Sequence, residues 1–299
     1  MRSHERRIAR TPAVPLRDRL EGRRYPPAHP NGTETRIDTA NQRKHYFEAA
    51  VGEGIADAMD QGLVTREDIF VQTKFTHLRG QDERLPYDPK APVSEQVQQS
   101  FASSREHLRM DYIDSLVLHG PTVRKGLAAP DLDAWKAMEA LHDTGVVGHI
   151  GVSNVTLEQL QMLKKVARVK PRFAQIRCYA TRNWDREMRD FCAANSIVYQ
   201  GFSLLTANRQ VLNHADMKDL ARRHNKTPAQ VIFRYALEGG MLPITGTRNA
   251  GHMAQDLDIF SFQLTVQDRR AIEAMAGEGG GMPFRVTIKR PGALPVDVH

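Results

Sequence analysis

Polar side chains that can exchange protons follow several apolar runs of this sequence, at the point where each run ends. They are Asp38, Lys74, His119 and the pair Ser153-Asn154. Taken singly, each has an ordinary structural explanation, since a lone histidine usually satisfies a local hydrogen bond and an aspartate after a strand often caps a helix. An acid, a lysine and a histidine at successive strand ends instead indicate one shared site where acid–base chemistry could take place.

The elements that would position these residues alternate along the chain from about residue 35. Short β-rich runs are separated by longer amphipathic stretches. The expected strands are Thr35–Asp38, Ile69–Phe75, Asp114–His119, His149–Asn154, Phe173–Tyr179, Ile197–Leu205 and Leu242–Gly246. Several of these runs are apolar on successive residues, which is typical of parallel strands covered on both faces.

Helical patterns fill the intervals between these runs. The expected helices are Phe47–Gln61, Val93–Leu108, Leu132–Thr144, Leu157–Ala167, Asp185–Ala194, Ala215–His224, Pro228–Leu237, Gly251–Asp258 and Val266–Ala276. Strand–helix alternation at this spacing predicts a parallel sheet with right-handed crossovers. The series favours an α/β fold of the (β/α)8 TIM barrel type, with an open doubly wound sheet as the alternative. A barrel would gather the polar strand ends at one mouth.

Two terminal regions depart from the alternation. Residues 1–34 contain five prolines and neither helical nor strand periodicity, so the first βα unit of a barrel is unrecognisable or missing there. At the other end, Gly277–Gly281 interrupts the last helix. We therefore expect an atypical arginine- and proline-rich segment at residues 1–34, a barrel at residues 35–276 and a C-terminal tail at residues 277–299.

The net charge of +7 is concentrated near the N-terminus. Residues 1–36 hold nine arginines and four acids, a net of +5, which leaves +2 for the rest. A nucleic-acid-binding domain usually concentrates charge on a folded face, so we expect no nucleic-acid partner. No apolar run approaches the ~18 residues of a membrane span and no apolar signal core is present, which predicts a cytoplasmic protein without a membrane partner. Reduced thiols are expected at Cys178 and Cys192.

Competing motifs are absent or incomplete. Gly52-x-Gly54 could begin a dinucleotide fingerprint, but Asp57 stands where the next glycine is required and the segment does not follow a strand. Ser153 lacks the flanking glycines of a nucleophile elbow. No second histidine at a strand end accompanies His119, and we expect no metal site.

Five segments of the chain resemble the aldo-keto reductases, and the similarity runs from about Arg36 to Ala276. The segments are Ile37–Ala40, Val71–Lys74, Asp111–His119, Gly148–Asn154 and Leu242–Arg248. The resemblance implies a catalytic tetrad of Asp38, Tyr46, Lys74 and His119. In most of the family the tyrosine follows the aspartate by five positions, where this chain has Arg43. The run Asn41–Tyr46 looks like a three-residue insertion, which makes Tyr46 the expected acid.

The tetrad has a physical logic. A carbonyl that accepts hydride develops negative charge on oxygen and needs a proton donor. Tyr46 would donate, and the ammonium of Lys74 would ease its ionisation. Asp38 would hold Lys74, and His119 would orient the carbonyl oxygen.

The resemblance also implies a nicotinamide cofactor site. Ser153, Asn154 and Gln175 resemble the residues that hold the carboxamide, and Phe202 replaces the usual stacking tyrosine. Ser203, Leu204 and Leu205 resemble the pyrophosphate loop. Gly246 and His252 stand where NADP-preferring members often have lysine and arginine, and Thr247 and Asp256 fill neighbouring polar positions. NADP is the expected cofactor, and the loss of two cations leaves NAD possible.

The sequence therefore predicts NAD(P)H-dependent reduction of an aldehyde or ketone, with a small-molecule carbonyl as substrate and a monomer as the family's usual state. One alternative is a nicotinamide-binding regulatory or interaction protein with little or no turnover. A second is a defective product, because loss of one βα unit would leave an open, marginally stable barrel. The substrate walls are expected in the loops at residues 76–92 and 121–133 and in the C-terminal tail. Four residues could line the pocket or merely pack the loops: Phe75, His77, Tyr87 and Pro121.

Overall fold

The computed structural model describes residues 35–277, and its centre is a parallel sheet of seven strands. The strands are β1 (Thr35–Asp38), β2 (Ile69–Phe75), β3 (Ile113–Leu118), β4 (Val147–Ser153), β5 (Phe173–Arg177), β6 (Val198–Phe202) and β7 (Leu242–Pro243). Each strand pairs with the next one along the chain. A doubly wound sheet would reverse its strand order at a switch point, so this order rejects the open-sheet alternative.

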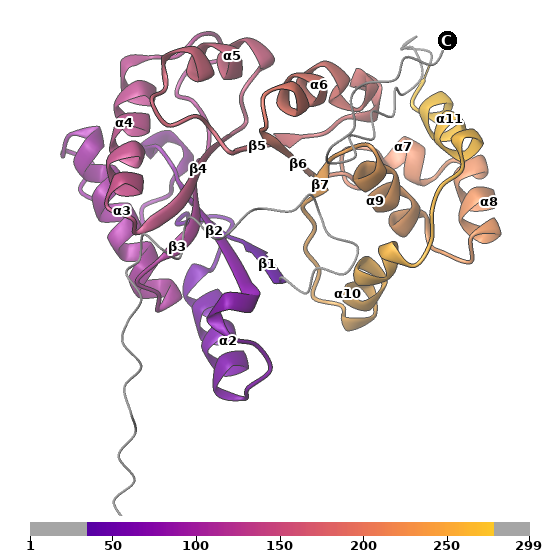
Figure 1. Cartoon of the computed structure of the whole chain (residues 1–299), viewed down its shortest axis with the longest axis horizontal. Coiled ribbons are helices and arrows are strands. Elements are labelled where there is room, and N and C mark those ends of the chain that lie inside the picture. The colour runs from indigo at the N-terminus through magenta and orange to yellow at the C-terminus, as the bar shows by residue number, and fades with distance from the viewer. Residues whose placement is uncertain (1–34, 278–299) are drawn as a thin grey trace, which may run out of the picture.

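Helices surround the strands on the outside (Figure 1). They are α2 (Glu48–Asp60), α3 (Val93–Leu108), α4 (Ala129–Asp143), α5 (Leu157–Val166), α6 (Arg186–Ala194), α7 (Arg209–Leu212), α8 (Ala215–Arg223), α9 (Pro228–Glu238), α10 (Ala250–Leu257) and α11 (Val266–Met275). Short 3-10 helices occur at Arg66–Asp68, Leu78–Gly80, Ala180–Asp185 and Asp258–Phe260. No helix among residues 35–277 is long and apolar enough to cross a membrane.

The predicted helices all occur, with ends that differ by at most three residues, and α3 has the predicted bounds. Thr156, Thr227 and Thr265 each accept a hydrogen bond from the backbone N–H three residues on, and each forms a capping box that fixes where its helix starts. The sequence did not predict α7, whose four residues are too few for a periodic pattern.

Three predicted strands are shorter in the structure. The run Ile197–Leu205 stops as a strand at Phe202, because Ser203 adopts a left-handed backbone with φ of 57°. The run Phe173–Tyr179 stops at Arg177, and Leu242–Gly246 forms ladder pairs only at its first two residues. Residues after these strands form loops at the mouth of the barrel.

The fold is a (β/α)8 TIM barrel, of which residues 35–277 form seven parallel strands and the helices around them. Within the described residues, β1 and β7 are the two edges of the sheet and do not pair with each other. A cavity of about 180 Å³ lies between these edges, lined by Arg36, Ile37, Asp38, Phe70, Gln72, Gln200, Leu242, Pro243, Ile244 and Thr245. The predicted N-terminal segment at residues 1–34 lies outside the described residues, and so does the predicted tail at residues 277–299 apart from Gly277.

Side chains fill the barrel in layers, as alternate residues of each strand point inward. At the amino ends of the strands, the ring of Phe173 lies 5.7 Å from that of Phe70 and 6.0 Å from that of His149. The next layer is polar and holds the glutamines of β2, β5 and β6, all nearly inaccessible to solvent. Outside the sheet, Cys178 and Cys192 are buried free thiols, and burial raises the pKa of each to about 12.

Gly52 and Gly54 of α2 offer a matched test of helix packing. A Cβ atom on Gly52 would lie 2.0 Å from the His107 carbonyl oxygen of α3, whereas one on Gly54 would meet nothing within 4 Å. We expect Gly52→Ala to lower the free energy of unfolding by about 1–3 kcal/mol through overpacking. Gly54→Ala should raise it by about 0.5–1 kcal/mol through helix propensity. Urea unfolding of both variants checks this, and equal effects would contradict the α2–α3 packing.

Candidate active site

A buried ion pair lies at the centre of the site. The Lys74 ammonium on β2 has no exposed surface and lies 2.7 Å from Asp38 Oδ2 at the end of β1. It also donates a hydrogen bond of 2.8 Å to the carbonyl oxygen of Thr39. An ammonium without such partners would be strongly disfavoured in this interior, so the pair fixes the position of the charge.

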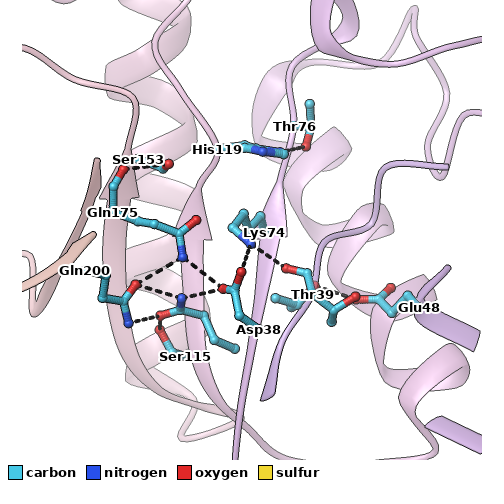
Figure 2. A network of polar contacts seen from close by, with 12 residues as sticks. Asp38, Thr39, Glu48, Lys74, Thr76, Ser115, His119, Ser153, Gln175 and Gln200 are labelled. Atoms are coloured by element: carbon cyan, nitrogen blue, oxygen red, sulfur yellow. Dashed lines mark hydrogen bonds and ion pairs between the residues drawn. The ribbon is translucent and has the colours of Figure 1, made fainter. Parts of the chain in front are cut away.

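The second oxygen of Asp38 is held by one amide from the neighbouring strand β2 and one from β5 across the barrel (Figure 2). Asp38 Oδ1 accepts hydrogen bonds from Gln72 Nε2 at 2.7 Å and Gln175 Nε2 at 3.0 Å. Both amides also donate to Gln200 Oε1, and Ser115 Oγ donates to Gln72 Oε1. This polar layer fixes the orientation of the carboxylate, so that its other oxygen faces the Lys74 ammonium.

Tyr46 reaches the ion pair from the loop between β1 and α2. The backbone N–H of Tyr46 donates to the Gln42 carbonyl, and the side chain of Gln42 donates to the Gly80 carbonyl at 2.7 Å. These bonds fold the predicted insertion into a tight turn. The Lys74 ammonium lies 4.9 Å from the centre of the Tyr46 ring, and the rings of Tyr46 and His119 are 5.8 Å apart, edge to face.

His119 follows β3 and is fixed at both ends. Its backbone N–H donates to the Phe75 carbonyl, and its Nδ1 lies 2.7 Å from Thr76 Oγ1. Burial, and next the positive charge of Lys74, lower the pKa of His119 to about 4. The imidazole is therefore neutral at neutral pH and can donate a hydrogen bond without carrying charge.

These groups line one cavity at the carboxyl ends of the strands, which we call the mouth cavity. It has a volume of about 230 Å³ and is lined by Asp38, Tyr46, His119, Ser153, Asn154, Gln175, Arg177, Phe202 and Ile244. The structure thus brings together three of the four predicted catalytic residues and four predicted cofactor residues, with Lys74 bonded beneath them. Arg177 and Ile244 were not predicted, although Arg177 shares the inward face of Gln175 two residues earlier.

Ser153 and Asn154 are tied to their neighbours in the mouth cavity. Ser153 Oγ donates to the Gln175 carbonyl at 2.8 Å, and Asn154 Nδ2 donates to the His119 carbonyl at 2.8 Å. Asn154 has a left-handed backbone with φ of 55°, which turns its side chain back over the strand end. Figure 2 shows the side-chain oxygen of Gln175 turned away from Asp38, toward the level of His119 and Ser153.

The loop after β6 is organised by a residue that the sequence did not reveal. Ser203 and Leu205 flank the buried Leu204 in this loop. Asn208, fully buried, donates to the carbonyls of Leu204 and Cys178 and accepts from the Ala180 N–H. An isolated asparagine carries no sequence signal for such a role.

The remaining predicted cofactor residues lie apart from the mouth cavity. Gly246, Thr247, His252 and Asp256 belong to the loop after β7 and to α10, and none of them lines that cavity. Asn249 caps α10 by accepting a hydrogen bond from the His252 N–H. The positive end of the α10 dipole therefore lies beside Thr247 and His252, whereas Asp256 lies in the last turn of the helix.

The loop at residues 76–92 packs on the barrel through aromatic side chains. Tyr87 is buried, donates from its hydroxyl to the Thr76 carbonyl, and lies 5.7 Å from the Phe75 ring. His77 Nε2 lies 3.4 Å from Asp131 Oδ1. None of these residues, nor Pro121, lines the mouth cavity, which favours the loop-packing interpretation.

The sequence matches the family model described as "Aldo/keto reductase family" over residues 31–276. It is 31% identical over 240 residues to a glyoxal reductase of Bacillus subtilis, covering 80% of this chain and 78% of the relative. An aldo-keto reductase of Bombyx mori, solved in complex with NADP, aligns with a TM-score of 0.66 at 28% identity, covering 80% of this chain and 78% of that one. The aldo-keto reductase MGS-M4 from a deep-sea metagenome library aligns with a TM-score of 0.69 at 25% identity, covering 85% and 86%.

The lowered pKa of His119 makes stability depend on pH. The unfolded chain binds this proton near pH 6.5 and the folded chain only near pH 4, so protons favour unfolding between these values. We expect the free energy of unfolding to fall as pH drops from about 6.5 toward 4, by at most about 3 kcal/mol from this group. Urea unfolding across this range checks it: His119→Asn should have a shallower dependence than the wild type, and identical slopes would refute the assignment.

Proposed function

Because this chain belongs to the aldo-keto reductase family, we propose that it reduces aldehydes or ketones to alcohols, with Tyr46 as the proton donor and NADPH or NADH as the source of hydride. One observation carries this proposal: the Tyr46 ring lies beside both the Lys74 ammonium and the His119 imidazole in a cavity at the barrel mouth. These three groups are the ones that carbonyl reduction requires around the developing oxyanion.

The protein's part in the reaction is to supply and position a proton. As negative charge grows on the carbonyl oxygen, the Tyr46 hydroxyl donates its proton there and becomes a phenolate. The ammonium of Lys74 stabilises that phenolate, and Asp38 and Thr39 keep the ammonium in place. His119, held neutral, directs the carbonyl oxygen toward Tyr46 without adding a competing charge.

The mouth cavity has groups suited to a nicotinamide ring. The side-chain oxygens of Gln175 and Asn154 provide acceptors for the N–H groups of a carboxamide, and Phe202 presents an aromatic ring. A bound reduced nicotinamide supplies hydride to the carbonyl carbon. Ser153 fixes the cavity wall through its bond to the Gln175 carbonyl.

Discrimination between NADPH and NADH would depend on the segment around α10. His252 is exposed in the first turn of α10, close to Thr247 and Gly246 along the chain. An imidazole lacks the bidentate donors with which a guanidinium binds a phosphate group. We therefore propose NADPH as the first cofactor, with only weak selection against NADH.

A guanidinium in place of the His252 imidazole tests whether the 2′-phosphate of NADPH binds near the start of α10. We expect His252→Arg to increase the preference for NADPH over NADH by roughly tenfold, because a bidentate pair with the 2′-phosphate is gained. Quenching of protein fluorescence during titration with each cofactor measures both dissociation constants. An equal change for NADPH and NADH would contradict the proposed location of the phosphate.

The proton donor is tested by removing a single oxygen atom. We expect Tyr46→Phe to lower kcat for aldehyde reduction by roughly 10²–10⁴-fold, with an unchanged circular dichroism spectrum. Tyr235→Phe is the matched control, since that hydroxyl lies outside the mouth cavity, 3.4 Å from Glu273 Oε1, and its loss should leave kcat unchanged.

An assay of cofactor oxidation separates a reductase from a nicotinamide-binding interaction protein with little or no turnover. Loss of absorbance of the reduced cofactor with a panel of aldehydes supports the reductase. Tight cofactor binding without turnover of any aldehyde would instead identify a nicotinamide-binding interaction protein. Undiminished turnover by Tyr46→Phe would reject the mechanism.

A further inference from the structure

Arg177 is a cation in the mouth cavity that the proposed mechanism does not use. It is the last residue of β5 and points to the same face as Gln175, so its side chain leaves the barrel wall at the mouth. It lines the same cavity as Tyr46 and His119. Its side chain is exposed, which leaves the guanidinium accessible to a small molecule in that cavity.

The charge of Arg177 is not balanced by the rest of the cavity wall. Asp38 is already paired with Lys74 at 2.7 Å. Within residues 35–277, Arg177 has no carboxylate within ion-pair distance, and the contact it makes is with the face of the Tyr179 ring, 5.6 Å from the guanidinium carbon. The wall of the mouth cavity therefore carries one net positive charge beside the proposed reaction centre.

A second cavity, which we call the side cavity, shares Arg177 with the first. It has a volume of about 370 Å³ and is lined by Val155, Thr156, Leu157, Ile176, Arg177, Arg182, Asn183, Asp185, Arg186, Glu187 and Met188. Its acids do not neutralise Arg177: Asp185 accepts a hydrogen bond from the Tyr199 hydroxyl, and Glu187 is exposed at the start of α6. Arg182 lies 5.0 Å from the same Tyr179 ring.

We infer that the preferred substrates are carbonyl compounds that also bear a carboxylate, and that Arg177 binds this carboxylate while the carbonyl oxygen lies beside Tyr46 and His119. This inference rests on the proposed function. A single guanidinium balances the one negative charge of a carboxylate. The two planar groups can also form a bidentate pair of hydrogen bonds. The group is a specificity determinant, since it would bind equally in the ground and transition states.

A phosphate of the cofactor is the other source of anionic oxygens near the mouth. The ladder pairs Arg177 with Phe202, the ring proposed to stack on the nicotinamide. The proposed pyrophosphate loop starts at Ser203, beyond that ring. Arg177 therefore lies beside the reacting end of the cofactor, where a substrate binds.

Two aldehydes that differ only in charge provide the test. The wild-type protein and the variants Arg177→Met, Arg177→Lys and Arg270→Met are assayed with 4-carboxybenzaldehyde and with its uncharged methyl ester, methyl 4-formylbenzoate. Arg270→Met is the matched control, because Arg270 is exposed on α11 and lines neither cavity. Circular dichroism of each variant confirms that it is folded.

We expect the wild type to favour the acid, and Arg177→Met to lower the acid-to-ester ratio of kcat/KM by at least about tenfold, mainly through KM. Arg177→Lys should keep part of the preference, and Arg270→Met should keep all of it. Equal reduction of both aldehydes by the wild type would overturn the inference and leave the proposed function standing. Failure to reduce either aldehyde would overturn both.

A second experiment measures the dissociation constants of NADPH and NADH for the same variants by fluorescence titration. The inference requires cofactor affinity in Arg177→Met within about threefold of the wild type, a difference below 1 kcal/mol. A weakening of tenfold or more, with an unchanged acid-to-ester ratio, would assign Arg177 to a cofactor phosphate and overturn the inference.

Discussion

The buried pair of Lys74 and Asp38 is the interaction on which the rest of this structure depends. Lys74 has no exposed surface, and its charge can be tolerated only because Asp38 Oδ2 and the Thr39 carbonyl both contact it. The carboxylate in turn depends on amides from β2 and β5 that saturate its other oxygen. The position of one ammonium is thus determined by three strands, and the aromatic ring of Tyr46 packs beside it.

This arrangement explains why the barrel interior is polar at mid-height. Barrels of this kind are commonly filled by branched aliphatic side chains. Here Gln72, Gln175 and Gln200 form a hydrogen-bonded layer in which each amide has a partner. Buried amides that lacked some of their hydrogen bonds would destabilise the protein, so the three glutamines depend on one another. His119 lies above this layer and adds no further charge at neutral pH, because burial and Lys74 both lower its pKa.

The sequence predicted the barrel well because its signals are local. Short β-rich runs placed β1 and β2 correctly to the residue, and polar strand ends pointed to Asp38, Lys74 and His119 as candidate site residues. Tyr46 could not be found from spacing, because a loop held by Gln42 places it, and only the family resemblance pointed to it. Gln72 and Gln200 were overlooked because their partners lie far away along the chain. The left-handed turn at Ser203, which ends β6, leaves no mark in the sequence.

Among residues 35–277, β1 and β7 do not pair with each other, and this changes what determines the width of the barrel. In a closed barrel, strand number and stagger set the radius through a continuous ring of backbone hydrogen bonds. Within the described residues this ring is interrupted, so the curvature of the sheet needs another restraint. The bond between Gln72 and Gln200 joins β2 to β6 across the lumen, and that between Gln175 and Asp38 joins β5 to β1. The contacts of the glutamines that orient the charged pair therefore also link strands across the barrel and restrain its width.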